Sequence, residues 1–516
     1  MSNHSNCPNL KKKHTFGQKD CDILHVSYFF TTFAPKFDGM KKLIGREREI
    51  QELERCLTSN QSEFVIVYGR RRVGKTFLVD EYFRQTFDFS FVGGHNLSVK
   101  KQLRNFAKAI KRYAHLPKQP KFEDWSEAFD ALTELIESIS EKRKKVIFID
   151  EMPWIDTPHS DFVEEFENFW NGWAARRRDI LLLASGSATS WMIDKLVDNQ
   201  GGLHCRITSN IYLKPFTLQE VEQYLRIKKC TWDRYQIVQA YMILGGVPFY
   251  WSLLDTKLSL VQNIDRLFFQ RNAILNIEFD ELYNALFTNA ERYVQIVQLL
   301  ANHKEGLTRN QIGEYTKLDG RALTAIHRNL ERCDFILKYS QLGNKVKDAI
   351  YRLSDFYTLF YLKYVHANNS LDEQWWSKHY MTHSVEAWQG QTYELVCMLH
   401  TDAIKQTLGI AGIATDIASW RYVPTKTSGE KGAQIDMVIS RADRVINLCE
   451  IKFAIGKYQL SKTYAEYLRD RIELFRAKTN TKYSIVQTML TTYGMADSVN
   501  SGIVQQEVVM DDMFNQ

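Results

Sequence analysis

The sequence predicts an α/β protein built from several domains, and three observations support this prediction. A short apolar stretch, residues 65–68, precedes a glycine-containing loop and then a helical pattern at residues 77–83. A second apolar stretch, residues 146–149, ends in two acidic residues, and such alternation of strands and helices is typical of a parallel sheet. The chain has 516 residues, which is too long for one hydrophobic core and fits about three domains.

The composition is that of an ordinary globular protein. Hydrophobic residues make up 44% and charged residues 25% of the chain, and no apolar run approaches the roughly 18 residues of a membrane span. No apolar segment with a small-residue cleavage site stands near the N-terminus, so a signal peptide is not expected. The eight cysteines are scattered without a C-x-x-C pair, which argues against a disulfide framework or a zinc site and favours a cytoplasmic location.

The net charge of +6 is mild for this length, and part of it comes from short basic clusters. These are residues 11–13, 70–72, 142–145 and 176–178. Such clusters are more often solvated faces than nucleic-acid sites. The charge therefore allows a nucleic-acid partner without indicating one.

The glycine-containing loop, residues 69–76, fits the phosphate-loop pattern G-x-x-x-x-G-K-[ST] in the strand–loop–helix context that this pattern needs. Its backbone N–H groups and the following helix N-terminus would surround the phosphates of ATP. Lys75 would contact the β- and γ-phosphates, and the Thr76 hydroxyl would bind Mg²⁺. The predicted ATP-binding residues of the loop are Gly69, Arg70, Arg71, Arg72, Val73, Gly74, Lys75, Thr76 and Phe77.

Asp150 and Glu151 follow the second apolar stretch, at the end of a strand where ligands bind in open α/β sheets. Asp150 is expected to bind Mg²⁺, and Glu151 to polarise the water that attacks the γ-phosphate. A third predicted strand, residues 180–184, ends in Ser185, Gly186 and Ser187. A serine there either senses the γ-phosphate or belongs to an ordinary turn, and the sequence does not separate the two.

Several segments together resemble an archaeal-type P-loop ATPase family within the AAA+/STAND group. They are residues 44–49, 69–76, 148–151, 185–187, 206–215 and 245–248, and the resemblance runs from about residue 43 to the C-terminus. It implies a catalytic phosphate contact for Arg206, within the chain or across a homo-oligomer interface. Family members usually have glycine before this arginine, where the present chain has Cys205. The resemblance also places Gly246 and Pro248 near the adenine. From the residues alone, Arg206 is equally well a surface arginine, and residues 245–248 are a helix stop and a turn.

Five parts are predicted along the chain. They are a lead-in without clear periodicity (1–39), an ATPase core (40–215), a helical lid (216–289), a winged helix (290–365) and a nuclease-like α/β domain (366–516). Either Met1 or Met40 would serve as the first residue. In the winged helix, Arg321, His327 and Arg328 of the third helix are candidates for DNA contact. The alternative is a winged helix that docks protein.

The last part carries Asp436 on one predicted strand and Glu450 and Lys452 on the next. The two-residue period of a strand places Glu450 and Lys452 on one face. Two carboxylates and a lysine can bind a divalent ion and activate water beside a phosphodiester. The pattern resembles the PD-(D/E)xK nuclease fold, which implies Glu394, Asp436 and Glu450 as metal ligands and Lys452 as a catalytic residue. The alternatives are a salt-bridged hairpin and a nuclease fold kept only for binding.

The sequence thus predicts an ATPase that uses Mg²⁺, with Lys75 and Glu151 as catalytic residues, and whose C-terminal domain acts on DNA. The competing hypothesis is a regulatory switch in which ATP controls the domain arrangement and the partner is a protein. A defence nuclease under ATPase control is compatible with the same residues. No membrane association is expected.

Overall fold

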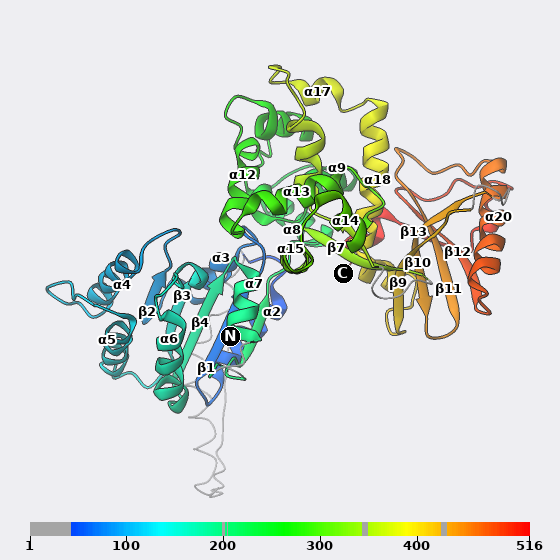
Figure 1. Ribbon diagram of the computed structural model, residues 1–516. Coiled ribbons are helices and arrows are strands. Elements are labelled where there is room, and N and C mark those ends of the chain that lie inside the picture. The colour runs from blue at the N-terminus through cyan, green and yellow to red at the C-terminus, as the bar shows by residue number, and fades with distance from the viewer. Residues whose placement is uncertain (1–42, 199–201, 204, 343–348, 425–430, 516) are drawn as a thin grey trace, which may run out of the picture.

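The computed structural model describes residues 43–198, 202–203, 205–342, 349–424 and 431–515 (Figure 1). The predicted lead-in and the choice between Met1 and Met40 lie outside these residues. Figure 1 shows one sheet at each end of the molecule and a mainly helical region between them. The α/β class predicted from the sequence is confirmed for the N-terminal sheet.

Within the described residues, the first sheet has five parallel strands in the order β2-β3-β4-β1-β5. The strands are β1 (Glu63–Tyr68), β2 (Phe89–Val92), β3 (Lys145–Asp150), β4 (Ile180–Gly186) and β5 (Ser209–Tyr212). The longer helices of this part are α2 (Glu47–Thr58), α3 (Lys75–Phe83), α4 (Val99–Tyr113), α5 (Trp125–Glu137) and α6 (Phe162–Gly172). Both faces of the sheet are buried, which explains the uninterrupted apolar run of β1. Phe64 and Ile66 pack in the cluster with α4, α5 and α6, while Val65 and Val67 pack in the cluster with α2 and α3.

The next part of the chain, residues 216–289, is helical, as predicted, and is called here the helical segment. Its α-helices are α8 (Leu218–Ile227), α9 (Arg234–Leu244), α10 (Pro248–Ser252), α11 (Leu260–Ile264) and α12 (Ile274–Leu286). Residues 290–353, the middle segment, contain three helices and three strands among their described residues. They are α13 (Ala290–Ala301), β6 (Leu307–Thr308), α14 (Arg309–Thr316), α15 (Gly320–Arg332), β7 (Ile336–Gln341) and β8 (Ile350–Leu353). Strand β8 pairs with both β6 and β7.

The remaining residues, 354–515, form the C-terminal segment. Its helices include α16 (Phe356–Phe360), α17 (Trp375–His379), α18 (His383–Leu399), α19 (Thr401–Thr407) and α20 (Lys462–Thr479). Its strands are β9 (Thr415–Tyr422), β10 (Ala433–Arg441), β11 (Val445–Lys452), β12 (Ser484–Thr491) and β13 (Gln506–Val509). The antiparallel pairing of β10 with β11 forms the hairpin that the sequence predicted for Asp436 and Glu450.

The second sheet crosses from the C-terminal segment into the middle segment. Its strand order is β13-β12-β11-β10-β9-β7-β8-β6 among the described residues. The junction is a short parallel pairing of β7 with β9, in which Ser340 lies opposite Ala418 and Gln341 opposite Ser419. The two segments are therefore joined by backbone hydrogen bonds as well as by side-chain packing.

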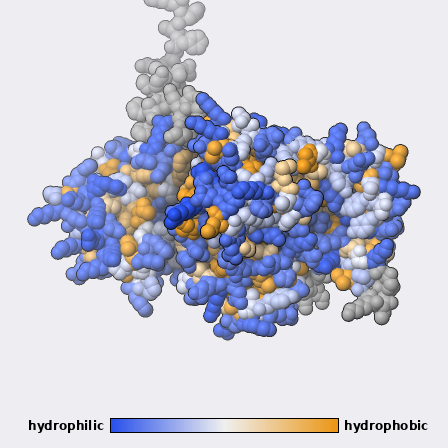
Figure 2. Space-filling model, turned by 90° about the horizontal axis from the view of Figure 1, so that it is seen from above, coloured by the Kyte–Doolittle hydropathy of each residue, from blue (hydrophilic) through white to orange (hydrophobic). Residues whose placement is uncertain are grey.

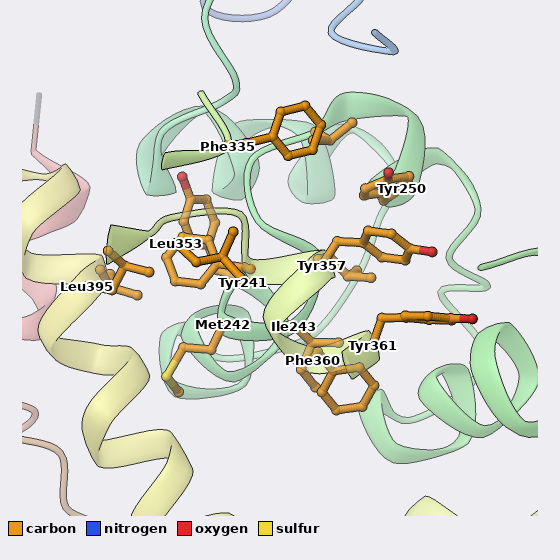
Figure 3. Close-up of a cluster of buried hydrophobic side chains, with 14 of the residues drawn as sticks. Tyr241, Met242, Ile243, Tyr250, Phe335, Leu353, Tyr357, Phe360, Tyr361 and Leu395 are labelled. Atoms are coloured by element: carbon orange, nitrogen blue, oxygen red, sulfur yellow. The ribbon is translucent and has the colours of Figure 1, made fainter. Parts of the chain in front are cut away.

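One hydrophobic core serves the helical, middle and C-terminal segments. Figure 3 shows part of this core, with Tyr241 from α9, Phe335 just before β7, Tyr357 from α16 and Leu395 from α18 in one cluster. The outer face shown in Figure 2 is largely hydrophilic, with hydrophobic side chains only in small groups. No helix in the described ranges is long and apolar enough to cross a membrane. The six cysteines of the described residues are free thiols.

Candidate functional site

The loop between β1 and α3 has a backbone that only glycine can supply at two positions. Gly69 has a φ of 144°, and a Cβ placed on it would lie 2.5 Å from the Leu213 carbonyl oxygen. Gly74 has a φ of 94° and precedes the first residue of α3. No side chain caps the N-terminus of α3, so its first N–H groups remain open toward the loop. Open N–H groups at a helix N-terminus form a ready site for phosphate oxygens.

Lys75 is buried, and its ammonium group closes the loop on itself. The Lys75 Nζ donates to the carbonyl oxygens of Gly69 at 3.1 Å and Arg70 at 3.0 Å, and to the Ser187 Oγ at 3.0 Å. Burial lowers the pKa of Lys75, although the nearby charge of Glu151 acts in the opposite direction. A phosphate in the loop would supply the missing counter-charge to this cation.

Thr76 and Asp150 bring two oxygen ligands together at the carboxyl edge of the sheet. The Thr76 Oγ1 donates to the Asp150 Oδ2 at 2.8 Å, and the Ser185 hydroxyl donates to the other carboxylate oxygen. Burial raises the pKa of Asp150, because the charged carboxylate loses solvent. These hard oxygen donors are of the kind that Mg²⁺ prefers, so Thr76 and Asp150 are the residues that could hold it.

Glu151 is connected to Lys75 through a single serine. The Glu151 carboxylate accepts hydrogen bonds from the Ser187 backbone N–H at 3.0 Å and from the Ser187 Oγ at 2.6 Å. Glu151 itself has a φ of 48°, an uncommon conformation for a residue with a side chain. Strand β4 lies between β3 and β1, so the serines at its end stand between the acidic pair and the loop. Ser185 and Ser187 thus contact three of the candidate site residues, Asp150, Glu151 and Lys75.

The side chains of two loop arginines, Arg70 and Arg72, are engaged in ion pairs outside the loop. The Arg70 Nη1 forms an ion pair with Asp355 at 2.7 Å, and both side chains are buried. The Arg72 Nη1 lies 2.5 Å from the Glu278 carboxylate on α12. Arg70 and Arg72 were predicted among the ATP-binding residues, and in this structure only their backbone N–H groups remain for that role. Val73 packs in the core beneath the loop, whereas Phe77 is 47% exposed.

The three residues implied by resemblance lie in different surroundings. Arg206 is exposed, and no ion pair or side-chain hydrogen bond joins it to another described residue. The Gly246 carbonyl accepts from the Phe216 N–H at 2.6 Å, and a Cβ on Gly246 would lie 2.0 Å from the Phe216 oxygen. Pro248 begins α10. The next residue, Phe249, lies under the Arg72 guanidinium at 4.2 Å, which brings α10 beside the phosphate loop.

A second group of ionisable residues is centred on the buried carboxylate of Glu450. It pairs with the Lys452 Nζ at 2.7 Å and with the Arg471 Nη1 at 2.6 Å, and it accepts a hydrogen bond from the Tyr464 hydroxyl. Burial raises the pKa of Glu450, but the charges of Arg471 and Lys452 outweigh it and hold that pKa below its ordinary value. Burial likewise lowers the pKa of Lys452, and the charge of Glu450 overcomes this and raises it. Glu450 and Lys452 therefore lie side by side on β11, as the two-residue period of a strand predicted.

Arg471 and Tyr464 were not identified from the sequence, although Arg471 carried a recognisable signal. On α20 it falls on the buried face with Ala465, Leu468 and Phe475. An arginine in an apolar stripe needs an acidic partner, because an unpaired charge is costly to bury.

Glu394 and Asp436 lie near Glu450 and repel one another. Asp436 precedes by one residue the pairing of Met437 with Cys449, so it lies across from Glu450. Burial, then the charge of Asp436, raises the pKa of Glu394 to about 7, although Arg352 opposes the shift from 3.7 Å. Burial, then the charge of Glu450, raises the pKa of Asp436. Within the described ranges, no three His, Cys, Asp or Glu side chains are placed to hold a metal ion. Glu450 does not join Glu394 and Asp436 in such a group because its carboxylate is paired with Lys452 and Arg471.

Glu394→Gln is expected to stabilise the fold above neutral pH. A carboxyl whose pKa rises from 4.5 to about 7 on folding contributes stability below pH 4.5 that is lost as the pH rises through 7. Removing it should raise the free energy of unfolding by roughly 2–3 kcal/mol at about pH 8, with a smaller gain at about pH 5. Denaturant unfolding at both pH values checks this, and an equal effect at both would contradict it.

Two of the candidate DNA-contact residues of α15, His327 and Arg328, contact other parts of the chain. His327 is buried and stacks on Tyr351 at 4.4 Å between ring centroids, and burial lowers its pKa to about 4. Arg328 lies 3.4 Å from Asp194 of the ATPase part, and Asn329 accepts from the Ser190 hydroxyl at 2.6 Å. The expectation that His327 contacts DNA is wrong for this structure, because the ring is enclosed. Arg321 is exposed.

Comparison with known proteins places the N-terminal part. Residues 43–254 match the model of an ATPase domain predominantly from Archaea. Over 337 residues the chain is 27% identical to an uncharacterized protein of Methanocaldococcus jannaschii, a match that covers 64% of this chain and 70% of the relative. Over 44 residues it is 41% identical to an uncharacterized ATP-binding protein of the same organism, covering 8% of this chain and 75% of the relative.

Two solved structures are similar over 62% of the chain. One is the Walker-type ATPase of Pyrococcus abyssi, with a TM-score of 0.45, 18% identity and coverage of 62% of this chain and 96% of that one. The other is the Aeropyrum pernix ORC2 protein, with a TM-score of 0.40, 13% identity and coverage of 62% and 93%. The family match spans all five strands of the first sheet, the phosphate loop and the acidic pair. The match to the ATPase domain found predominantly in Archaea therefore covers the whole candidate nucleotide site of this chain.

Proposed function

We propose that this protein binds and hydrolyses ATP with Mg²⁺ and that its C-terminal segment acts on DNA. The observation that carries the ATPase part is the hydrogen-bonded chain from Lys75 through Ser187 to Glu151, beside the contact of Thr76 with Asp150. These groups come from the ends of three neighbouring strands or their loops, where a nucleotide would lie.

Each residue of this site has a distinct task in the proposed reaction. The loop N–H groups bind phosphate oxygens, and Lys75 exchanges its bonds to Gly69 and Arg70 for the β- and γ-phosphates. Thr76 and Asp150 would hold Mg²⁺, which supplies neutralisation of phosphate charge when bound. Glu151 accepts a hydrogen bond from the attacking water and orients it, and Ser187 fixes the Glu151 carboxylate.

Glu151→Gln tests this assignment. The variant should bind ATP as tightly as the unmodified protein but hydrolyse it roughly a hundredfold more slowly, the scale expected when one stabilising group is lost from a preorganised site. Phosphate release and binding of a fluorescent ATP analogue measure the two properties. Glu164→Gln, an exposed change on α6, is the matched control. Normal turnover in Glu151→Gln would remove Glu151 from catalysis.

For the C-terminal segment, we propose a PD-(D/E)xK nuclease-like domain, with the middle segment as a winged helix. Support comes from Asp436 and Glu450 on paired strands, Lys452 beside Glu450, and Glu394 on α18. In this proposal Glu394, Asp436 and Glu450 would bind the metal, which requires Glu450 to release Lys452 and Arg471. Nicking of plasmid DNA with Mg²⁺ or Mn²⁺ should be lost in Asp436→Ala and in Lys452→Ala. If the unmodified protein cuts no DNA with either metal, the domain is a binding module.

A second candidate function, an ATP-controlled switch for a protein partner, is favoured by the buried ion pairs of the loop. Arg70 and Arg72 pair with Asp355 and Glu278, which lie in the C-terminal and helical segments. A conformational change in the phosphate loop would therefore move these segments through the two ion pairs. ATP hydrolysis that DNA stimulates favours the first function, and slow hydrolysis independent of DNA favours the switch. The exposed Arg206 would serve either function if it reached the nucleotide of a second copy in a homo-oligomer.

A further inference from the structure

A cavity of about 430 Å³ lies between the middle and C-terminal segments. Its lining includes Lys304, Tyr339 and Arg352 from the middle segment and Glu394 and Asp436 from the C-terminal segment. The two acidic residues proposed for the nuclease-like site therefore face a space that their own segment encloses only in part. The volume falls within the ~300–1,000 Å³ of typical ligand pockets, which suits a nucleotide unit and not the width of a duplex.

The two walls of this cavity are held in a fixed relation. Strand β7 pairs with β9, and the Leu342 N–H donates to the Ser419 carbonyl at 2.9 Å. Arg421 on β9 forms an ion pair with Glu305, and the Tyr339 hydroxyl donates to the Glu305 carbonyl at 3.0 Å. Because the strand pairing, the Leu342 bond and the Arg421–Glu305 pair cross the junction, the middle segment forms one wall of the cavity.

Glu305 of the middle segment and Arg421 of the C-terminal segment also line the cavity, and they pair with each other. This pair leaves Lys304 and Arg352 on one wall and Glu394 and Asp436 on the other. Arg352 is only 11% exposed, donates to the Gln391 carbonyl at 3.1 Å and lies 3.7 Å from Glu394. Lys304 is exposed, and no ion pair or side-chain hydrogen bond links it to another described residue. A cationic wall facing carboxylates is what a phosphodiester strand needs, because the cations bind its phosphates while the carboxylates stand beside the backbone.

We propose that this cavity binds single-stranded nucleic acid, with Lys304 and Arg352 of the middle segment holding its phosphates and the Tyr339 ring available to a base. The proposal rests on the proposed action of the C-terminal segment on DNA, and it assigns part of the binding site to a different segment. Grooves for single strands combine cations that follow the backbone with aromatic rings that stack on bases.

The test measures binding of a labelled oligothymidine of about 12 nucleotides to the full chain. Fluorescence anisotropy reports the binding, and EDTA is present to prevent cleavage. Lys304→Ala should weaken binding about fourfold at roughly 0.15 M salt and lower the slope of log affinity against log salt by about 0.7. Arg352→Lys should weaken binding with little change in that slope, since the charge stays and the paired N–H donors are lost. Arg476→Ala, an exposed change on α20 outside the cavity, should bind as the unmodified protein does.

Unchanged binding in both Lys304→Ala and Arg352→Lys would overturn the proposal, and so would an equal loss in Arg476→Ala. A duplex of the same sequence that binds as tightly as the single strand, with the same dependence on Lys304, would also overturn it. The outcome is separate from that of the nuclease proposal. Binding that depends on Lys304, without any cleavage, would support the proposed binding cavity and refute the nuclease proposal. Cleavage that is unaffected by Lys304→Ala and Arg352→Lys would support the nuclease proposal and refute the binding cavity.

Discussion

Lys75→Ala is expected to abolish tight ATP binding and, with it, hydrolysis. The Lys75 Nζ is buried at the centre of the loop, in contact with Gly69, Arg70 and Ser187. The neighbouring Arg70 and Arg72 cannot replace it, because their guanidinium groups pair with Asp355 and Glu278. Charge-assisted hydrogen bonds to phosphate are about twice as strong as neutral ones, so their loss has a large effect.

Titration with a fluorescent ATP analogue, together with phosphate release, measures this prediction. Circular dichroism should show an intact fold, because removing a buried cation relieves its desolvation cost. Lys101→Ala, an exposed change on α4, controls for loss of positive charge in the same domain. ATP affinity in Lys75→Ala close to that of the Lys101→Ala protein would contradict the assignment of Lys75.

Asp355→Ala is expected to lower the free energy of unfolding by about 3–5 kcal/mol, the cost of leaving a buried charge without its partner. The side chains of Arg70 and Asp355 are only 3% and 2% exposed. The Arg70 Nε and Nη2 already lack hydrogen-bond partners among the described residues, so the guanidinium depends on Asp355 and on the Phe335 ring at 4.6 Å. Asp355 also caps α16 by accepting from the Thr358 N–H at 3.1 Å.

Denaturant unfolding of three proteins separates these contributions. Asp355→Asn keeps a side-chain acceptor for the cap but removes the charge, so it should recover only the smaller capping part of about 1 kcal/mol. Asp402→Ala, which breaks the exposed pair with Lys405, should cost no more than about 1 kcal/mol. A loss in Asp355→Ala as small as that in Asp402→Ala would show that the ion pair does not hold the phosphate loop to the C-terminal segment.

The features that the sequence predicted well are local ones. The phosphate loop needs only a strand, two glycines and a helix within 63–83, and all three are determined by neighbouring residues. The pairing of Glu450 with Lys452 follows from the two-residue period of β11, and a short turn places Asp436 on the adjoining strand. In each case the interacting groups are close in the chain, so periodicity alone fixes their relation.

The long-range features depended on the tertiary structure. Ser187 reaches both Lys75 and Glu151 because β4 lies between β1 and β3, and no local pattern specifies that strand order. Arg70 belongs to the phosphate loop, which the local sequence predicts. The partner of its side chain, Asp355, lies 285 residues further along the chain, so no local pattern identifies it.

The same distinction applies to the C-terminal segment. The sequence by itself determined that Lys304, Arg352, Glu394 and Asp436 are charged. It did not determine that these residues line one cavity. That arrangement required β7 to pair with β9, which joins two separately predicted domains in one sheet. Backbone hydrogen bonds are the same for any sequence, so the choice of partner strand is made by the packing of the whole molecule and not by the strand's own residues.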